Sequence, residues 1–451
     1  MTVPAQAARR TGAVEARDAR RVATTGDGTA EPAMNPGDEL RLLQETVLRV
    51  NAAPYEVAKQ VVRQARLEPS TLLCRGDSKA AAARYGALAA ALARNTVFDG
   101  GVYDASGAAV PLAVHCGGGR RHVPAPRPDA GPAEHLSGTW LFGGVFHRHP
   151  GHFLTESLGR LWLAPRMAGR LAGVVWLMPG PLGPKAAERA PAIIANGFAT
   201  QMLGLLGIEG PHRGVVAPVT VDRLVVPAQL MMNHGGPPIA GHAAFRNFAR
   251  ALLAASGAAD QPGGDRVYVS RAGLGTNGRF LLEEHIESTL AQAGWIIMRP
   301  ETLPVAEQVR VYARASHLVF AEGSAMHLFA LVARPSQKAA VIFRRKPPKR
   351  KFGLQLRGAG VREVHEIDAV RGLFAAMAAE DGPGAVPNQA VSLLDFDAVG
   401  RALAEAGFLR PGEWISPDPA AIDAAARAML SSPSDGPPVR FMPMHDVLQS
   451  T

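Results

Sequence analysis

The chain has 451 residues, of which 47% are hydrophobic and 19% charged, a balance typical of a folded globular protein. Its formal charge of +9 would suit an anionic partner, but aromatic residues make up only 6% and are not interleaved with basic ones. We therefore expect no nucleic-acid partner. The two cysteines show no CxxC spacing and signal neither a zinc cage nor a disulfide framework.

The first part of the chain has no pattern of a folded element. Residues 1–37 mix Ala, Arg, Thr, Gly and Pro without apolar periodicity, which predicts a disordered tail. The basic N-terminus is not followed by the apolar core of a secretory signal, and no run approaches the roughly 18 apolar residues of a spanning helix. We expect a cytoplasmic protein, with peripheral contact at the inner face of the membrane as an option.

Residues 38–230 are interpreted as an N-terminal, acceptor-side domain. Apolar spacing predicts helices at 38–50, 80–93 and 191–206, with Pro191 at the favoured first helical position, and strand-like pieces at 96–114, 140–145, 174–178 and 215–226. The Pro- and Gly-rich stretch 120–138 is interpreted as a loop. Two glycines and two prolines at 231–241 indicate a linker and a candidate hinge.

Residues 266–331 alternate between strand and helix patterns, which indicates half of a doubly wound parallel sheet. Strands are predicted at 266–270, 295–298 and 317–321, each followed by a helix. We assign 242–390 to a C-terminal Rossmann-like domain, with further strands at 339–343 and 364–367. Residues 391–451 are interpreted as a helix and a proline-rich tail with one helical segment.

Ligands of such sheets bind outside the carboxyl ends of the strands, so two turns should face one crevice. Arg271 follows the first strand, and its planar guanidinium suits phosphate oxygens, although a surface ion pair would also explain it. Glu322, Gly323 and Ser324 follow the third strand and precede a helix at Ala325. That helix terminus could cradle a diphosphate, or Ser324 could be an ordinary N-cap.

The glycine-rich turn at 273–278 fits GxGxxG, and Glu301 lies just past the next strand. Three interpretations stay open: a dinucleotide site of an NAD(P)-dependent oxidoreductase, a plain turn, or the phosphate-facing loop of another nucleotide enzyme. The late start of helical character, near Leu281, weighs against the dinucleotide site.

A histidine-rich corner, His147, His149 and His152, follows the strand at 140–145. Its spacing matches no standard metal-ligand set, so we expect no metal site there. His152 and Glu156 are four residues apart and share a helix face. Each could be a buried, hydrogen-bonded structural residue or a general base.

Two charged patterns have simple structural explanations. Asp395 and Asp397 form a DxD pattern, but they open a predicted helix, which favours an N-cap over a cation site. The basic run at 344–351 is interpreted as a solvated face, with an anionic acceptor or lipid surface as the functional alternative.

Several short motifs in order resemble glycosyltransferase family 61. They are YVSR at 268–271, LLEE at 281–284, LPVAEQ at 303–308, EGSA at 322–325 and the upstream GHFLTESLGRLWL at 151–163, with Arg160 and Trp162. Eukaryotic members often carry a PHGAG-like segment where this chain has AEGSA. Bacterial members are similar to proteins of capsule or lipopolysaccharide assembly.

The resemblance implies an α/β protein with two Rossmann-like lobes facing a cleft, the B type of glycosyltransferase fold. It implies inverting transfer from a nucleotide sugar to a glycan or glycolipid acceptor, without a cofactor or a DxD-bound metal. The expected catalytic residues are His152 and Glu156. The expected donor-binding residues are Ser270, Arg271, Glu322, Gly323, Ser324 and Ala325. A non-catalytic polysaccharide-assembly protein is the remaining alternative.

Overall fold

The computed structural model describes residues 38, 41–46, 57–75, 83, 95–117, 120–125, 131–178, 186–195, 197–233, 237–258, 263–275, 278–376, 389–431 and 437–444. Residues 41–46 are helical, as predicted. The predicted tail at 1–37, and the predicted helix at 80–93 apart from Ala83, lie outside the described residues.

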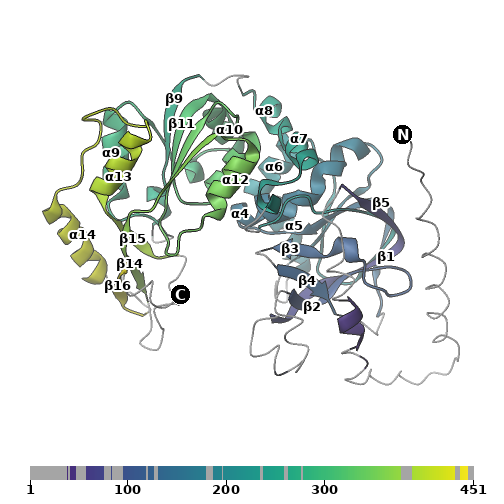
Figure 1. Ribbon diagram of the computed structural model, residues 1–451. Helices are drawn as coiled ribbons and strands as arrows, with labels where there is room; N and C mark the ends of the chain where they lie inside the picture. Colours follow the sequence, from purple (N-terminus) through teal and green to yellow (C-terminus); the bar gives the residue numbers. More distant parts are fainter. Residues whose placement is uncertain are drawn as a thin grey trace, which may run out of the picture.

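An eight-stranded sheet forms the N-terminal half, with the order β3-β4-β2-β1-β8-β5-β6-β7 (Figure 1). Its strands are β1 Lys59–Arg75, β2 Asn95–Tyr103, β3 His115–Gly117, β4 Arg120–Pro124, β5 Glu134–Val145, β6 Gly173–Leu177, β7 His212–Val215 and β8 Val219–Pro227. Strands β8, β5, β6 and β7 run parallel, whereas β1 is antiparallel to β2 and β8. This sheet is therefore mixed, and only part of it has the parallel pairing expected of a Rossmann-like lobe.

Strand β1 has no counterpart among the predicted elements, and a backbone irregularity at Gln64 explains why. Gln64 has a φ of 48°, while its neighbours Arg63 and Ala65 pair with Arg223 and Val221 of β8 in one unbroken register. The buried residues Val62 and Ala65 are three positions apart and break the period of two that identifies a strand. The loop predicted at 120–138 is wrong at both ends, where β4 and the start of β5 lie.

Short helical segments surround this sheet: η3 Pro111–Ala113, α4 Pro150–His152, the π-helical η4 Phe153–Ser157, the 3₁₀-helical η5 Leu158–Met167, α5 Ala186–Ala195 and α6 Phe198–Leu205. The helix predicted at 191–206 is two helices. Pro191 lies inside α5, not at a helix start, and Gly197, with a φ of 83°, separates α5 from α6. Only glycine adopts that backbone conformation without strain.

A five-stranded parallel sheet forms the C-terminal half, with the order β10-β9-β11-β12-β13. Its strands are β9 Asp265–Val269, β10 Ile296–Met298, β11 Ala315–Ala321, β12 Lys338–Ile342 and β13 Glu363–Ile367. The helical segments are η6 Pro237–Ala240, α7 Ala243–Ala249, α8 Ala251–Ala255, η7 Ala272–Leu274, α9 Glu283–Gln292, η8 Pro300–Thr302, α10 Val305–Arg314, α11 Ala325–Val332 and α12 Lys351–Ala359. The α/β class and the predicted half-sheet at 266–331 are confirmed.

Helices cover both faces of the five-stranded sheet (Figure 1). Tyr268 in β9 packs with α9 and α13, Phe396–Glu405, while its neighbours Val267 and Val269 pack on the opposite face with α10 and α11. This alternation is the side-chain period of a strand. A three-stranded sheet of β14 Val370–Ala376, β15 Val391–Leu394 and β16 Val439–Pro443 lies beside it, with α14 Pro419–Ser431. Strands β15 and β16 thus lie in the segment predicted as a helix and tail.

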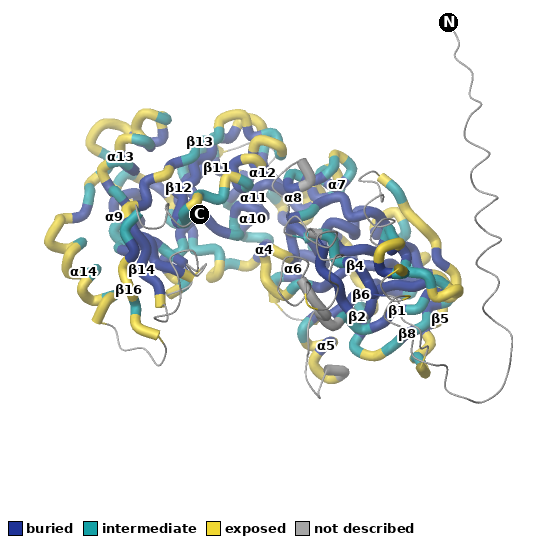
Figure 2. Tube along the Cα trace, turned by 60° about the horizontal axis from the view of Figure 1, so that its bottom comes forward, coloured by how far each residue is buried: buried dark blue, intermediate teal, exposed yellow. Residues whose placement is uncertain are grey.

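One apolar cluster continues from the N-terminal half into the C-terminal half. It joins Phe153 and Leu154 to Met326 and Phe329, and α10 packs against α6 and α8. In Figure 2 the buried trace runs through both halves and the exposed segments lie at the rim. Met231, the first residue of the predicted linker, is fully buried in the same cluster.

The described helices include none with both the length and the apolar character of a membrane span.

Candidate functional site

A cavity of about 940 Å³ lies between the two halves, at the carboxyl ends of β9 and β11. The strand order of the five-stranded sheet reverses between these two strands, and ligands of parallel sheets bind at such a reversal. We call its two sides the histidine wall (His149, Gly151, His152 and Asn233, with Glu156 behind them) and the basic wall (Arg271, Arg344, Arg345, Lys349 and Lys351).

A buried carboxylate fixes the conformation of the turn after β9. Glu283, the first residue of α9, is fully buried and accepts hydrogen bonds from the hydroxyls of Tyr268 and Ser270 and from the backbone amide of Arg271, the last at 2.6 Å. Ser270 therefore holds the turn, although it also lines the cavity. The Arg271 side chain donates from Nε to the Gly278 carbonyl at 2.7 Å, which aims the guanidinium at the cavity.

Glu322, after β11, plays the same part for the basic run. Its fully buried carboxylate accepts the Arg344 backbone amide at 3.0 Å and Arg345 Nη2 at 2.5 Å. Glu322 is not among the residues that line the cavity, because its side chain holds the two arginines, and its contact with a donor stays a prediction. Glu322 is a positioning residue for the basic wall.

The basic wall concentrates positive charge where water is partly excluded. Burial, and then the neighbouring Arg345 and Arg271, lower the pKa of Arg344 to about 9. Burial and the cations Arg345 and Lys351 lower the pKa of Lys349 to about 8. Burial is likewise the main cause of the lowered pKa of Arg271 and of Lys351. An anion in the cavity would relieve this repulsion.

The N-terminus of α11 also opens on the cavity. Gly323, Ser324 and Ala325 line it, and the Ser324 side chain makes no capping hydrogen bond, so the N-cap alternative is not supported. A Cβ on Gly323 would lie 2.4 Å from Arg271 Nη1, so this glycine makes room for the arginine. A Cβ on Gly151 would lie 2.7 Å from Ser324 Oγ, so the two walls meet here.

The histidine wall begins where β5 ends. Ser157 Oγ donates to the Val145 carbonyl and accepts the His147 backbone amide, which fixes this turn. His149 Nδ1 accepts the Gly151 amide and caps α4. The following turn is π-helical, a widened geometry that is common at functional sites.

His152 and Glu156 face one another as predicted, with 2.5 Å between Nδ1 and Oε1. The His152 side chain is 48% exposed and lines the cavity, whereas that of Glu156 is 4% exposed. Asn233 donates to the same Oε1 at 3.2 Å and accepts from Lys351 Nζ at 2.5 Å. This chain of polar contacts connects the two walls.

Glu156 is surrounded by histidines. Burial acts to raise its pKa, but hydrogen bonds from His115, His147 and His152 outweigh it, and the pKa lies well below its ordinary value. The other carboxylate oxygen, Oε2, lies 3.0 Å from His115 Nε2 and 3.4 Å from His147 Nε2. Burial lowers the pKa of His115 to about 3, which keeps its imidazole neutral. Glu156 is thus an anion that orients its neighbours.

Other residues of the motifs are structural. Arg160 is buried and donates to the backbone carbonyls of Leu112, Val114 and Pro227, and Trp162 donates to that of Ala228. These bonds tie the 3₁₀ helix η5 to η3 and to the end of β8. His327, one turn into α11, is buried and hydrogen-bonded to Gln355.

The geometry of the glycine-rich turn argues against a dinucleotide site. Residues 272–274 form a short 3₁₀ helix, and α9 starts only at Glu283, after Leu282 in a left-handed conformation. The buried Glu283 carboxylate lies at the helix terminus, where a pyrophosphate would need positive potential. The Gly278 amide donates to the Gln389 carbonyl.

The two remaining charged patterns have opposite outcomes. Asp395 caps α13 through the Ala398 amide at 2.9 Å, as predicted. The interpretation of 344–351 as a solvated face is wrong for most of the run, because Arg344, Arg345, Lys349 and Lys351 line the cavity. Arg350 and Lys346 are the exceptions: Arg350 is exposed and pairs with Glu366, and Lys346 pairs with Asp368.

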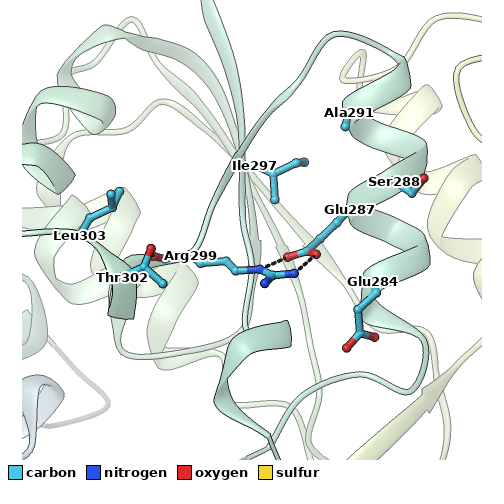
Figure 3. A pocket seen from close by; sticks show the side chains of 8 residues that line it. All are labelled: Glu284, Glu287, Ser288, Ala291, Ile297, Arg299, Thr302 and Leu303. Carbon is cyan, nitrogen blue, oxygen red and sulfur yellow. Dashed lines mark hydrogen bonds and ion pairs between the residues drawn. The ribbon is translucent and has the colours of Figure 1, made fainter.

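A second, more open hollow of about 470 Å³ lies beside α9. Figure 3 shows its cation, Arg299, in a two-point ion pair with Glu287. The distance is 2.8 Å from Nε to Oε1 and 2.5 Å from Nη2 to Oε2. Because Glu287 already neutralises this guanidinium, the hollow lacks the crowded positive charge of the basic wall.

The sequence alone does not reveal the residues that reach the candidate site through tertiary contacts. His115 is 41 residues from Glu156 and Asn233 is 77 residues from it. The basic run carried a signal, because it directly follows the strand β12, whose carboxyl end lies at the same edge of the sheet as those of β9 and β11.

Comparison with known proteins finds a match to a family model. No curated protein matches the chain. The model of the family described as Glycosyltransferase 61 matches residues 151–340. The match starts at Gly151 on the histidine wall and includes the turns after β9 and β11, but ends before the basic run. Residues 151–340 are thus similar to a glycosyltransferase family 61 domain, which supports a glycosyltransferase that acts on a sugar donor and an acceptor.

Proposed function

We propose that the protein is an inverting glycosyltransferase of the two-lobed B type, which transfers a sugar from a nucleotide-sugar donor to a glycan or glycolipid. The observation that carries the proposal is the convergence of Arg271, Arg344, Arg345, Lys349 and Lys351 on one cavity at the reversal of a parallel sheet. Surface polysaccharide assembly, with the enzyme at the cytoplasmic face of the membrane, is the setting we propose.

The basic wall and the α11 terminus would bind the donor diphosphate. Arginine forks match phosphate oxygens, and the helix terminus adds positive potential. Since Lys349 and Arg344 are crowded by other cations, a diphosphate would stabilise their charged forms. This wall can supply the charge stabilisation that a metal ion gives in other transferases, which supports a donor site that needs no metal.

The histidine wall would bind the acceptor. If Nδ1 of His152 donates to Glu156, the Nε2 lone pair is left for an acceptor hydroxyl. Glu156 would fix the tautomer and the ring orientation, as the buried carboxylate does in other histidine pairs.

The transfer would be a single displacement. The acceptor oxygen forms a bond to the anomeric carbon, and the bond from that carbon to the phosphate oxygen breaks. The diphosphate leaves with the electron pair and is stabilised by Arg271 and the α11 terminus. The hydroxyl proton goes to His152 Nε2, and the anomeric configuration inverts.

A thermal-shift screen of nucleotide sugars tests the donor class, with NAD(P) as the competing ligand. A ligand at 100 times its Kd stabilises a protein by about 2.7 kcal/mol, a readily measured shift. We expect a nucleotide diphosphate sugar to stabilise the protein, followed by transfer to an acceptor panel. Stabilisation by NAD(P) alone would favour the oxidoreductase, and donor binding without transfer or hydrolysis would favour the non-catalytic alternative.

The basic run offers a matched pair of variants for this screen. Arg345→Ala removes a cation that lines the cavity, and Arg350→Ala removes one from the same run that pairs with Glu366 outside it. We expect the donor-induced shift to be lost in the first and retained in the second. Equal shifts in both variants would contradict the assignment of the cavity to the donor.

A further inference from the structure

Behind the histidine wall, three ligand atoms converge that the proposed transfer does not use together. His115 Nε2, His147 Nε2 and Glu156 Oε2 come from β3, from the turn after β5 and from the π-helical segment. The His115 and Glu156 side chains are 1% and 4% exposed, and that of His147 is 21% exposed. They form a buried triangle of two imidazoles and a carboxylate.

The sides of this triangle are those of a metal-ligand set. They measure 3.0 Å, 3.2 Å and 3.4 Å. Atoms that lie about 2.0 to 2.1 Å from one ion are about 2.9 Å apart in octahedral and about 3.4 Å apart in tetrahedral coordination. The two ring centroids are 5.2 Å apart, farther than their Nε2 atoms, so both nitrogens point into the space between the rings.

Protons alone cannot satisfy the three contacts. If His115 Nε2 and His147 Nε2 both carry a proton and donate to Glu156, two donors face each other at 3.2 Å. If only one of them carries a proton, the lone pair of the other nitrogen faces the lone pairs of Glu156 Oε2, at 3.0 Å for His115 or 3.4 Å for His147. A cation at equal distance from the three atoms would attract the lone pair of each of them.

We propose that His115, His147 and Glu156 bind one divalent first-row transition-metal ion, of which Zn²⁺ is the representative. Two imidazole nitrogens and one carboxylate oxygen favour such an ion over Mg²⁺ or Ca²⁺, which prefer oxygen ligands. A set of three protein ligands leaves a coordination position open.

The surroundings hold these ligands in place. The second carboxylate oxygen of Glu156 is bonded to His152 and Asn233, as the outer contacts of metal-binding carboxylates are. The Ser157 hydroxyl fixes the backbone of His147. A Cβ on Gly117 would lie 2.1 Å from Glu156 Oε2, so only glycine leaves room for this oxygen. The ion would hold Glu156 and, through it, the His152 ring on the cavity wall.

The metal-free protein, prepared without a polyhistidine tag and treated with a chelator, is the material for the test. It is incubated with Zn²⁺ or Co²⁺, separated from free ion and subjected to elemental analysis, and its unfolding is followed with and without the ion. Co²⁺ adds a visible absorption that reports nitrogen and oxygen coordination. Metal binding is measured without donor or acceptor, so it can succeed or fail independently of the proposed transfer.

His147→Ala is the informative variant, because its partly exposed ring can be removed with less risk to the fold than the buried ring of His115. His135→Ala is the control, since His135 is exposed on β5 and pairs with Asp222. We expect about one ion per chain and a higher Tm for the wild type and for His135→Ala, and at least about tenfold weaker binding for His147→Ala. Wild-type protein that binds no ion, or binds it no better than His147→Ala, would overturn the proposal.

Discussion

The two walls of the cavity differ in how their charges are balanced. On the histidine wall, hydrogen bonds from three histidines hold the Glu156 carboxylate ionised in spite of its burial. On the basic wall, burial and neighbouring cations lower the pKa values of Arg344 and Lys349. The charge of the histidine wall is balanced by groups of the protein itself, which suits a site of proton transfer. The basic wall has surplus positive charge and suits an anionic ligand.

Removal of His152 should give the largest effect and act on turnover. A positioned general base contributes about 10²- to 10⁴-fold, so we expect His152→Ala to lower transfer by that factor while donor affinity changes little. Steady-state transfer and donor titration on the same preparation measure both. A large loss of donor affinity with unchanged turnover would mean that His152 binds the donor and is not the general base.

Removal of Arg271 should instead act on the donor. Loss of a charge-assisted two-point contact costs about 1.5 to 3 kcal/mol, so Arg271→Ala should weaken donor binding by about 10- to 100-fold and lower turnover with it. Arg271→Lys keeps the charge but lacks the planar guanidinium, so its donor affinity should lie between those of the wild type and Arg271→Ala. Unchanged donor affinity in Arg271→Ala would remove the phosphate role.

A rise in pH should weaken donor binding by a smaller factor than these substitutions, because it acts on the basic wall. The pKa of Lys349 is about 8, below its ordinary 10.5, because of burial and the cations Arg345, Lys351 and Arg344, against which Glu322 acts. Above about pH 8 its charge is lost, so donor affinity should fall several-fold toward pH 9.5. Lys349→Arg stays charged at this position and should show a smaller fall, of which the remainder belongs to Arg344, whose pKa is about 9. Titration of both proteins over this range is the measurement.

The same shift has a defined effect on stability. Between about pH 8 and 10.5 the unfolded chain holds more protons at Lys349 than the folded one. Stability without a ligand should therefore rise with pH across this window, while donor affinity falls. Parallel trends in the two quantities would contradict the assigned pKa.

The smallest effect is expected outside both walls. Asp395→Ala removes the N-cap of α13 and should cost about 1 kcal/mol of stability without changing donor affinity. Chemical unfolding and donor titration check both parts. A loss of donor binding in this variant would restore the DxD pattern as a cation site.

The sequence predicted the C-terminal sheet well because its strands and helices follow their periodicities directly. Strand β1 was not predicted because the left-handed backbone at Gln64 leaves its buried residues Val62 and Ala65 three positions apart. The pair of His152 and Glu156 was predictable from helix spacing, whereas His115 and Asn233 reach Glu156 only through the tertiary fold. The basic run was misinterpreted because charge alone does not reveal that Glu322 holds its arginines against the cavity.

The apolar cluster that joins Phe153 and Leu154 to Met326 and Phe329 has a consequence for how the protein unfolds. Separation of the two halves would expose apolar surface on both of them to water. Unfolding of one half alone would therefore also destabilise the other half. The two walls should therefore unfold in a single cooperative transition. The backbone amides of α10 and α6 should then show similar protection against hydrogen exchange. A substitution of Phe153 or Phe329, which belong to that cluster but do not line the cavity, would then weaken donor binding and acceptor chemistry together.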